Sequence, residues 1–165
     1  MTIVPYDRQS AVAYAHRWAF ARNPRYYNFD DLGGDCTNYA SQTLYAGCGI
    51  MNYASNDHGW FYVSLNKRAP AWTGVEELHR FLTGNTAGPG PFAEEVDPGA
   101  AESGDIAQLS FDGEGFQHSP VIVRSARYLD ELLVAAHTYD TDYRPLSTYP
   151  YAAVRFLHIL GVRKA

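Results

Sequence analysis

Apolar side chains recur every three to four positions in several segments of the first half of the chain, and this spacing predicts amphipathic helices. The predicted helices cover residues 7–21, 36–46 and 73–84. Pro24 would end the first helix at Asn23, because the residue before a proline avoids helical geometry. Gly47 and Gly49 would end the second helix, and Thr73 would cap the start of the third.

The pattern changes in the second half, where short runs of alternating or β-branched apolar residues predict strands. These runs are "DIAQLSF", "HSPVIVRSAR", "ELLVAAHTY" and "AAVRFLHILGV", and a further short strand is expected at residues 59–64. The glycine- and proline-rich residues 86–104 predict a surface loop between the two halves. Helices followed by antiparallel strands predict an α+β fold, in which N-terminal helices pack on a C-terminal antiparallel sheet.

Length and charge narrow the class of protein. A chain of 165 residues fits one domain, so residues 1–165 are expected to form a single unit. The net charge of −5 predicts no nucleic-acid partner, because phosphate binding needs a basic patch. No apolar run reaches the ~18 residues that span a bilayer, so no membrane partner is predicted. The N-terminus lacks a signal-peptide pattern, which predicts a cytoplasmic chain as given, or else a module of a longer exported protein.

The stretch "GGDCTNYASQ", residues 33–42, places Cys36 at the predicted start of a helix. Unpaired backbone N–H groups there can lower the pKa of the thiol and can bind the oxyanion of a tetrahedral intermediate. A buried structural thiol is the alternative, since cysteine is among the residues most often buried. Cys48 lies among small residues in "AGCGI" and is interpreted as structural. Two free thiols are expected rather than a disulfide.

A cysteine nucleophile needs a base, which is usually histidine. His118 opens one predicted strand and His137 ends the next, so a hairpin of these strands would bring the two rings together. One ring would act as the base, and the other would orient it through its second ring nitrogen. A zinc site of Cys36, His118, His137 and Asp140 is the weaker alternative, because no CxxC or HExxH spacing is present. No metal and no cofactor is therefore predicted.

Several motifs together resemble the putative amidase domain family, which is similar to the NlpC-type and CHAP branches of the papain-like cysteine peptidases. The segments that carry this resemblance are "YDRQSAVAYAHRWAFARNPRYYNF", "GGDCTNYASQTLYAGCGIMN", "HGWFY", "GDIAQLSF", "FQHSPVIV" and "HTYDTDYRPLS". The resemblance implies a papain-like fold with Cys36 as nucleophile and His118 as base. It implies His137 as the third polar residue, with Asp140 as a substitute.

Five residues near these motifs are candidates for contact with the substrate, and most have a structural alternative. Asp35 would tune the thiolate or cap the helix. Asn38 would line the cleft or satisfy buried backbone groups. Tyr27 lies, with Asn23 and Tyr26 as alternatives, where papain-like folds place an oxyanion-hole side chain. Trp60 would line a substrate groove or belong to the core. Asp140 is the fifth candidate for contact with the substrate.

The main functional hypothesis is a cysteine-dependent amide hydrolase that acts on a peptide or another amide-containing substrate through an acyl-thioester. One alternative passes the same thioester to an amine, as an acyl transferase or a cyclase does. Another is a binding module that keeps the fold without activity. Substrate identity and oligomeric state are left open by the sequence.

Overall fold

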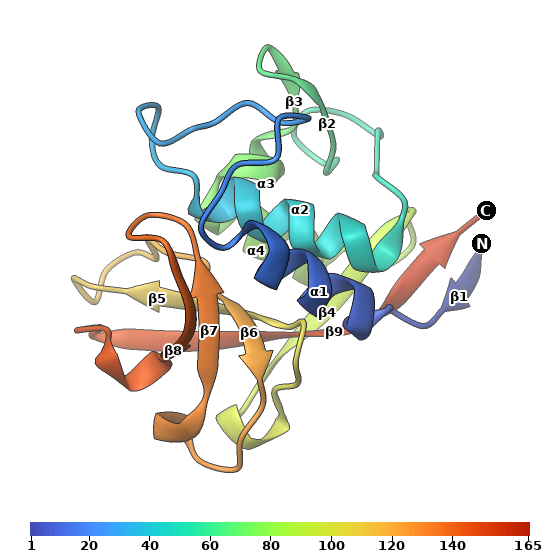
Figure 1. The fold of residues 1–165 in the computed structure, drawn as a ribbon. Coiled ribbons are helices and arrows are strands. Elements are labelled where there is room, and N and C mark those ends of the chain that lie inside the picture. The colour runs from blue at the N-terminus through green and yellow to red at the C-terminus, as the bar shows by residue number, and fades with distance from the viewer.

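The computed structural model describes residues 1–165 and consists of helices packed against an antiparallel sheet (Figure 1). Its α-helices are α1 (Arg8–Trp18), α2 (Cys36–Cys48), α3 (Pro70–Thr73) and α4 (Val75–Gly84). This mixture of helices and antiparallel sheet is the one that the sequence predicts. The papain-like topology stays a prediction.

The main sheet has seven strands in the order β1-β9-β5-β6-β7-β8, with β4 paired to the opposite edge of β9 from β1 and β5. The strands are β1 (Thr2–Val4), β4 (Gly90–Val96), β5 (Ile106–Ser110), β6 (Val121–Arg124), β7 (Leu133–Ala136), β8 (Thr141–Pro145) and β9 (Ala153–Lys164). Every pairing between them is antiparallel. Because β9 pairs with β1, β4 and β5, it joins distant parts of the chain, and the two termini lie side by side (Figure 1).

A separate hairpin of β2 (Tyr62–Ser64) and β3 (Lys67–Arg68) covers part of the short strand expected at residues 59–64. Short 3₁₀ turns follow three of the longer elements. They are η1 (Pro98–Ala100), η2 (Leu129–Glu131) and η3 (Leu146–Thr148). The last of these turns leads directly into the candidate active site.

The four predicted strand runs each contain a strand, whereas the predicted surface loop at residues 86–104 is wrong. Within that stretch β4 pairs with β9 along its whole length, from Gly90 opposite Arg163 to Val96 opposite Phe156. Glycine and proline indicate a loop when they are considered locally. The twelve-residue β9 supplies backbone partners that local composition does not reveal, so tertiary pairing overrides the local preference.

Three helix boundaries differ from the predicted ones: the end of α1, the end of α2 and the start of α4. α1 starts as expected, with the Asp7 carboxylate accepting a hydrogen bond from the Ser10 N–H at 3.0 Å, but it ends at Trp18. Thr73 does not cap α4, since it is the last residue of α3 and Gly74 separates the two helices. Residues 75–84 of the predicted third helix therefore form α4, and Thr73 belongs to the preceding helix α3.

α2 extends to Cys48 because Gly47 lies inside the helix rather than after it. A Cβ atom at Gly47 would collide with the Tyr6 ring, so the glycine allows a close approach between the helix and the segment before α1. Gly49 ends the helix in the left-handed conformation, with φ of +70°, and its N–H donates to the carbonyl of Tyr45.

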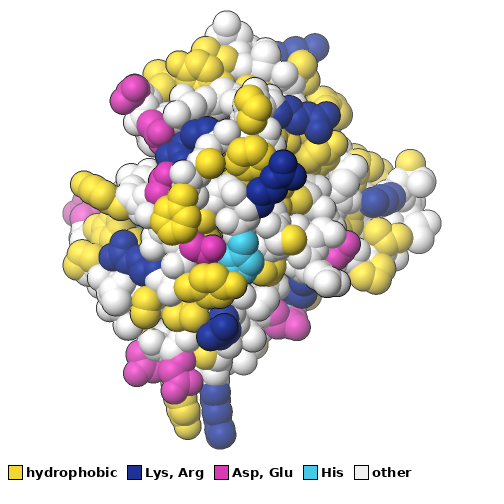
Figure 2. Space-filling model, in the orientation of Figure 1, with side chains coloured by type: hydrophobic (Ala, Val, Ile, Leu, Met, Phe, Trp, Pro, Cys, Tyr) yellow, Lys and Arg dark blue, Asp and Glu magenta, His cyan; other side chains and the backbone are white.

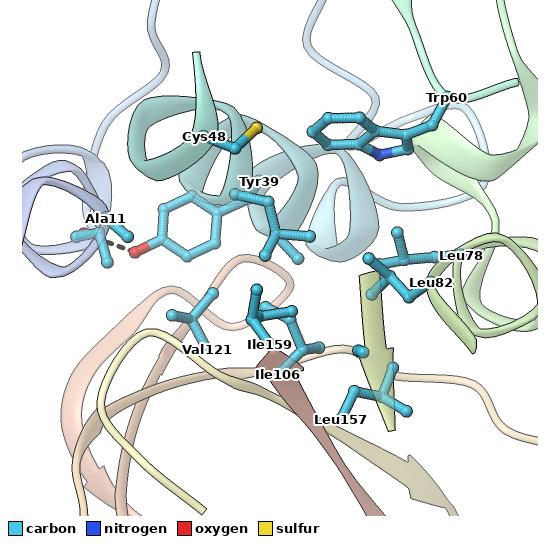
Figure 3. Packing of buried hydrophobic residues seen from close by; sticks show 14 of the residues in the cluster. Ala11, Tyr39, Cys48, Trp60, Leu78, Leu82, Ile106, Val121, Leu157 and Ile159 are labelled. Carbon is cyan, nitrogen blue, oxygen red and sulfur yellow. Dashed lines mark hydrogen bonds between the residues drawn. The ribbon is translucent and has the colours of Figure 1, made fainter. Parts of the chain in front are cut away.

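The main apolar core fills the space between the helices and the sheet (Figure 3). Tyr39 of α2 is fully buried in this core, and its hydroxyl donates to the carbonyl of Ala15 in α1 at 2.5 Å. Trp60, Leu78 and Ile159 are also buried in it. Burial of such side chains contributes roughly 1.5–3 kcal/mol each, so α2 is held firmly between α1 and the sheet.

No helix of the structure has the length and apolar character needed to cross a membrane. Figure 2 shows that Lys and Arg side chains are interspersed with Asp and Glu side chains on one face of the molecule. That face has no extended patch of a single charge.

Candidate active site

The loop before α2 positions Cys36 through two glycines. Gly33 and Gly34 have φ values of +84° and +93°, which other residues rarely adopt. The chain turns there, and α2 begins at Cys36 itself. The residue is 8% exposed, and its Sγ lies 3.7 Å from the hydroxyl oxygen of Thr37. The nucleophile candidate is therefore nearly buried, in the first turn of a helix whose N–H groups are unpaired.

The strand segment that contains His118 lies against the start of α2. His118 forms a bridge to Leu109 of β5, and the next residue, Ser119, directs its backbone N–H at the sulfur of Cys36. The Ser119 hydroxyl accepts a hydrogen bond from the Thr37 hydroxyl at 3.1 Å. Residues 36–37 and residues 118–119, which are far apart in sequence, are thus in contact in the fold.

The His118 ring is enclosed by aromatic side chains. Its centroid lies 5.4 Å from that of Tyr149 and 6.3 Å from that of Phe111. His118 is 5% exposed, and its Nε2 is buried without a hydrogen-bond partner. Burial, with a smaller contribution from the Arg144 cation, lowers the pKa of His118 to about 4. The imidazole is consequently neutral at pH 7 and able to accept a proton.

Burial also raises the pKa of the Cys36 thiol, although the Ser119 N–H and the Thr37 hydroxyl and N–H act in the opposite direction. The sequence led us to expect that the helix start would lower this pKa. The expectation is wrong because desolvation of the thiolate outweighs the N–H groups. In the free protein the two groups are therefore a neutral thiol and a neutral imidazole.

His137 has a different place from the one predicted. Strands β6 and β7 do form the expected antiparallel hairpin, with Val121 opposite Ala135. The His137 ring nevertheless uses both nitrogens elsewhere: Nδ1 lies 2.5 Å from Asp35 Oδ2, and Nε2 lies 2.7 Å from the Trp18 carbonyl oxygen. It has no nitrogen left to orient His118. The carboxylate and the carbonyl are both acceptors, so each ring nitrogen of His137 faces an acceptor within the protein.

Asp35 is the N-cap residue of α2 but makes no capping hydrogen bond, which corrects that expectation. Its Oδ1 accepts from the Phe29 N–H at 2.8 Å and from the Asn38 amide at 2.9 Å, while Oδ2 faces His137. The buried carboxylate therefore ties the preceding loop, α2 and the end of β7 together. Its role is to hold the Cys36 loop in place.

Asn38 and Trp60 are structural rather than substrate-facing. Asn38 is 1% exposed and donates to the Tyr27 carbonyl at 3.0 Å, while its carbonyl accepts from the Trp72 indole at 2.9 Å. Trp60 is fully buried in the core, as Figure 3 shows, and donates to the Ser41 hydroxyl at 3.0 Å. Neither side chain is accessible to a substrate, so their predicted substrate-binding roles are wrong.

Tyr27 and Asp140 are more exposed. The Tyr27 side chain projects outward with the residue 43% exposed, and its backbone N–H donates to the Tyr62 hydroxyl. Asp140 forms two hydrogen bonds of 2.9 Å with the Arg22 guanidinium. Because Arg22 engages both of its oxygens, Asp140 contributes an ion pair on the surface rather than a partner for His118.

The remaining thiol and histidines lie outside this site. Cys48 is 3% exposed and donates to the Ile50 carbonyl at 3.3 Å, in agreement with the structural interpretation. Three histidines pair with carboxylates: His16 with Asp142, His79 with Glu95 and His158 with Asp105. No group of three His, Cys, Asp or Glu side chains is arranged to hold a metal ion.

Three residues near Cys36 and His118 were missed by sequence reasoning. Ser119 and Thr37 could have been noticed, because each adjoins a predicted catalytic residue. Tyr149 had no such signal. It lies in a turn after η3, and only the fold brings its ring next to His118.

Comparison with known proteins identifies the family. The family described as "Putative amidase domain" matches residues 5–160, and the chain belongs to it. The family description suggests a hydrolase of amide bonds. The chain is 32% identical over 166 residues to "Uncharacterized protein YhbB" of Bacillus subtilis (strain 168), an alignment that covers 94% of this chain and 50% of the relative. The chain thus spans about half the length of that relative. No solved structure matches it.

Proposed function

We propose that this chain is a cysteine-dependent amide hydrolase of the papain-like type, related to the NlpC and CHAP branches, with Cys36 as nucleophile and His118 as base. The observation that carries the proposal is the N–H of Ser119, the residue after His118, directed at the Cys36 sulfur at the start of α2. This contact brings the backbone of a potential base to a potential nucleophile. Membership of the amidase family supplies the class of bond.

The protonation states define the first chemical step. Because Cys36 is a thiol and His118 a neutral imidazole, proton transfer accompanies attack instead of preceding it. The imidazole takes the S–H proton as the sulfur bonds to the carbonyl carbon, and the carbonyl π electrons move to oxygen. Unpaired N–H groups in the first turn of α2 stabilise this oxyanion.

The second half of the reaction returns the enzyme to its starting state. The oxyanion reforms the carbonyl, the C–N bond breaks, and the His118 imidazolium gives its proton to the leaving amine. Water then attacks the thioester while His118 removes its proton, and the imidazolium reprotonates the departing sulfur. The products are an amine and a carboxylic acid. Because its buried surroundings lower the pKa of His118, the imidazolium readily donates its proton to the amine.

Mass spectrometry of the intact protein tests this proposal. Native chain, C36A and C48A are mixed with a panel of small amide and ester substrates, and the covalent adducts and products are measured. An acyl adduct is expected on the native chain and on C48A, the matched control that removes the other buried thiol, but not on C36A. Full turnover by C36A would refute the cysteine mechanism. Added amines distinguish hydrolysis from acyl transfer, since a transferase would convert them to new amides.

A further inference from the structure

Two buried polar atoms on neighbouring rings of the candidate site have no hydrogen-bond partner. They are Nε2 of His118 and the hydroxyl oxygen of Tyr149. The two residues are 5% and 9% exposed, and their ring centroids lie 5.4 Å apart with the planes tilted by 53°. Buried polar groups are almost always paired, so an orphaned donor and an orphaned acceptor on neighbouring rings call for a functional reason.

The surrounding residues hold the Tyr149 ring in place. The guanidinium carbon of Arg144 lies 3.6 Å from the ring centroid. Arg144 is itself fixed by Thr148, through Nε to the hydroxyl oxygen at 2.7 Å and through an amino nitrogen to the carbonyl oxygen at 3.2 Å. The Tyr149 N–H donates to the Leu146 carbonyl at 3.1 Å. The phenol is therefore a fixed neighbour of the imidazole.

Tyr149 is also close to the nucleophile. Burial raises the pKa of the Tyr149 hydroxyl, and a Cys36 thiolate raises it further through its charge. The Arg144 guanidinium lowers it through its charge and through its close approach to the hydroxyl, although that approach does not form a well-aligned hydrogen bond. The phenol thus lies within electrostatic reach of Cys36 as well as beside His118. The other groups that face His118 are the Phe111 ring and the Arg144 cation, neither of which can accept a hydrogen bond.

We propose that Tyr149 is the positioning residue of His118, its hydroxyl oxygen accepting a hydrogen bond from Nε2–H when an acyl group occupies the site. The inference rests on the proposed function and gives to Tyr149 the role that the sequence predicted for His137. Catalytic hydrogen bonds are often unformed in the free enzyme and tighten with substrate. With the proton fixed on Nε2, Nδ1 keeps its lone pair for the Cys36 thiol.

A role in packing alone makes a different prediction for Y149F. The hydroxyl has no partner in the free protein, so its removal costs the fold no hydrogen bond, and the ring keeps its contacts. A packing residue would therefore tolerate phenylalanine without loss of stability or activity. If Tyr149 positions His118, the Y149F variant should keep its stability and lose activity.

The experiment compares native chain, Y149F and the control Y151F, which removes a hydroxyl from a partly buried tyrosine of the same segment. Melting temperature is measured, together with kcat and KM on the best ester substrate of the panel. The His118 tautomer is determined by nitrogen-15 NMR after iodoacetamide has alkylated Cys36, so that the site is occupied without turnover.

The expected result for Y149F is an unchanged or higher melting temperature, a kcat reduced about 10- to 100-fold as for other residues that orient a functional histidine, and a KM within about twofold of native. The His118 tautomer should change from Nε2-protonated to a mixture, while Y151F should match the native chain. A native kcat and tautomer in Y149F would overturn the inference. A melting temperature that falls along with kcat would also overturn it, because that pattern indicates a structural role.

The tautomer readout separates this inference from the proposed function. Turnover by C36A would refute the cysteine mechanism whatever Y149F does. A catalytically essential Cys36 together with a native Y149F would leave the hydrolase proposal intact and remove only the role of Tyr149.

Discussion

The Nδ1 atom of His137 lies 2.5 Å from Oδ2 of Asp35, and both side chains are 1% exposed. The two residues are 102 positions apart in sequence, and Asp35 immediately precedes the nucleophile candidate Cys36. The His137 ring also stacks on Tyr39 of α2, with centroids 4.1 Å apart. A buried polar contact therefore fastens the end of β7 to the start of α2, where it fixes the position of the thiol.

Neutralising one member of this pair should destabilise the fold. D35N replaces a carboxylate oxygen by an amide N–H₂ group, which leaves at least one buried partner of Asp35 without its acceptor, and we expect a loss of about 1–3 kcal/mol in the free energy of unfolding. Urea denaturation measures it. D140N, which breaks the more exposed pair with Arg22, is the control and should cost about 0–1 kcal/mol. Equal losses in the two variants would contradict a buried polar link at Asp35.

His118 should make stability depend on pH on the acid side. Its folded pKa of about 4 lies below the ordinary histidine pKa of 6.5, so the unfolded chain binds the proton first. The contribution is fully present above pH 6.5 and is lost as pH falls toward 4, by about 3 kcal/mol at ~1.4 kcal/mol per unit. Urea unfolding of native chain and H118Q between pH 4 and 7 tests this. Parallel curves for the two proteins would show that His118 is not buried in its neutral form.

The same histidine should set the acid limb of activity. The value of kcat/KM reports groups of the free enzyme, so it should stay flat from pH 7 down to about 5 and fall only near pH 4. Initial rates at low substrate concentration give this profile, with circular dichroism at each pH to verify folding. An acid limb near pH 6.5 would mean that the base titrates like a solvent-exposed imidazole.

Cys48 should affect stability on the alkaline side. Burial raises its pKa from 9.0 to about 11, so the unfolded chain ionises first as pH rises. The contribution is present below pH 9 and is lost between pH 9 and 11, by about 3 kcal/mol. The free energy of unfolding of C48A should lack this part of the pH dependence. If native and C48A lose stability in parallel over that range, the thiol at position 48 is not desolvated.

Trp60 should contribute to stability and not to substrate affinity. W60F removes the indole donor to Ser41 and leaves that buried hydroxyl without its partner, at a cost of about 1–3 kcal/mol plus any cavity left by the smaller ring. Melting temperature should fall while KM remains native. A raised KM with an unchanged melting temperature would instead show that Trp60 contacts the substrate.

Local patterns were sufficient for the features that depend on neighbouring residues. The double glycine and the helical spacing after it placed Cys36 at a helix start, and alternating apolar residues identified β5, β6, β7 and β9. The expected β6–β7 hairpin follows from the same alternation, because consecutive strands with a short connection pair antiparallel. These properties are set by backbone preferences within a few residues, and a sequence records them directly.

The protonation states and the partners in the site were decided by the tertiary structure alone. Desolvation reversed the expected lowering of the Cys36 pKa, and burial depends on the whole fold rather than on the helix start. The His137 ring turned to Asp35 and Trp18 instead of His118, and β4 paired with a strand about 70 residues away. Each outcome is a contact between distant segments, whose free energy depends on which groups the packed chain removes from water. The sequence by itself therefore determined where the nucleophile candidate Cys36 lies, and the tertiary structure determined its charge state and which residues surround it.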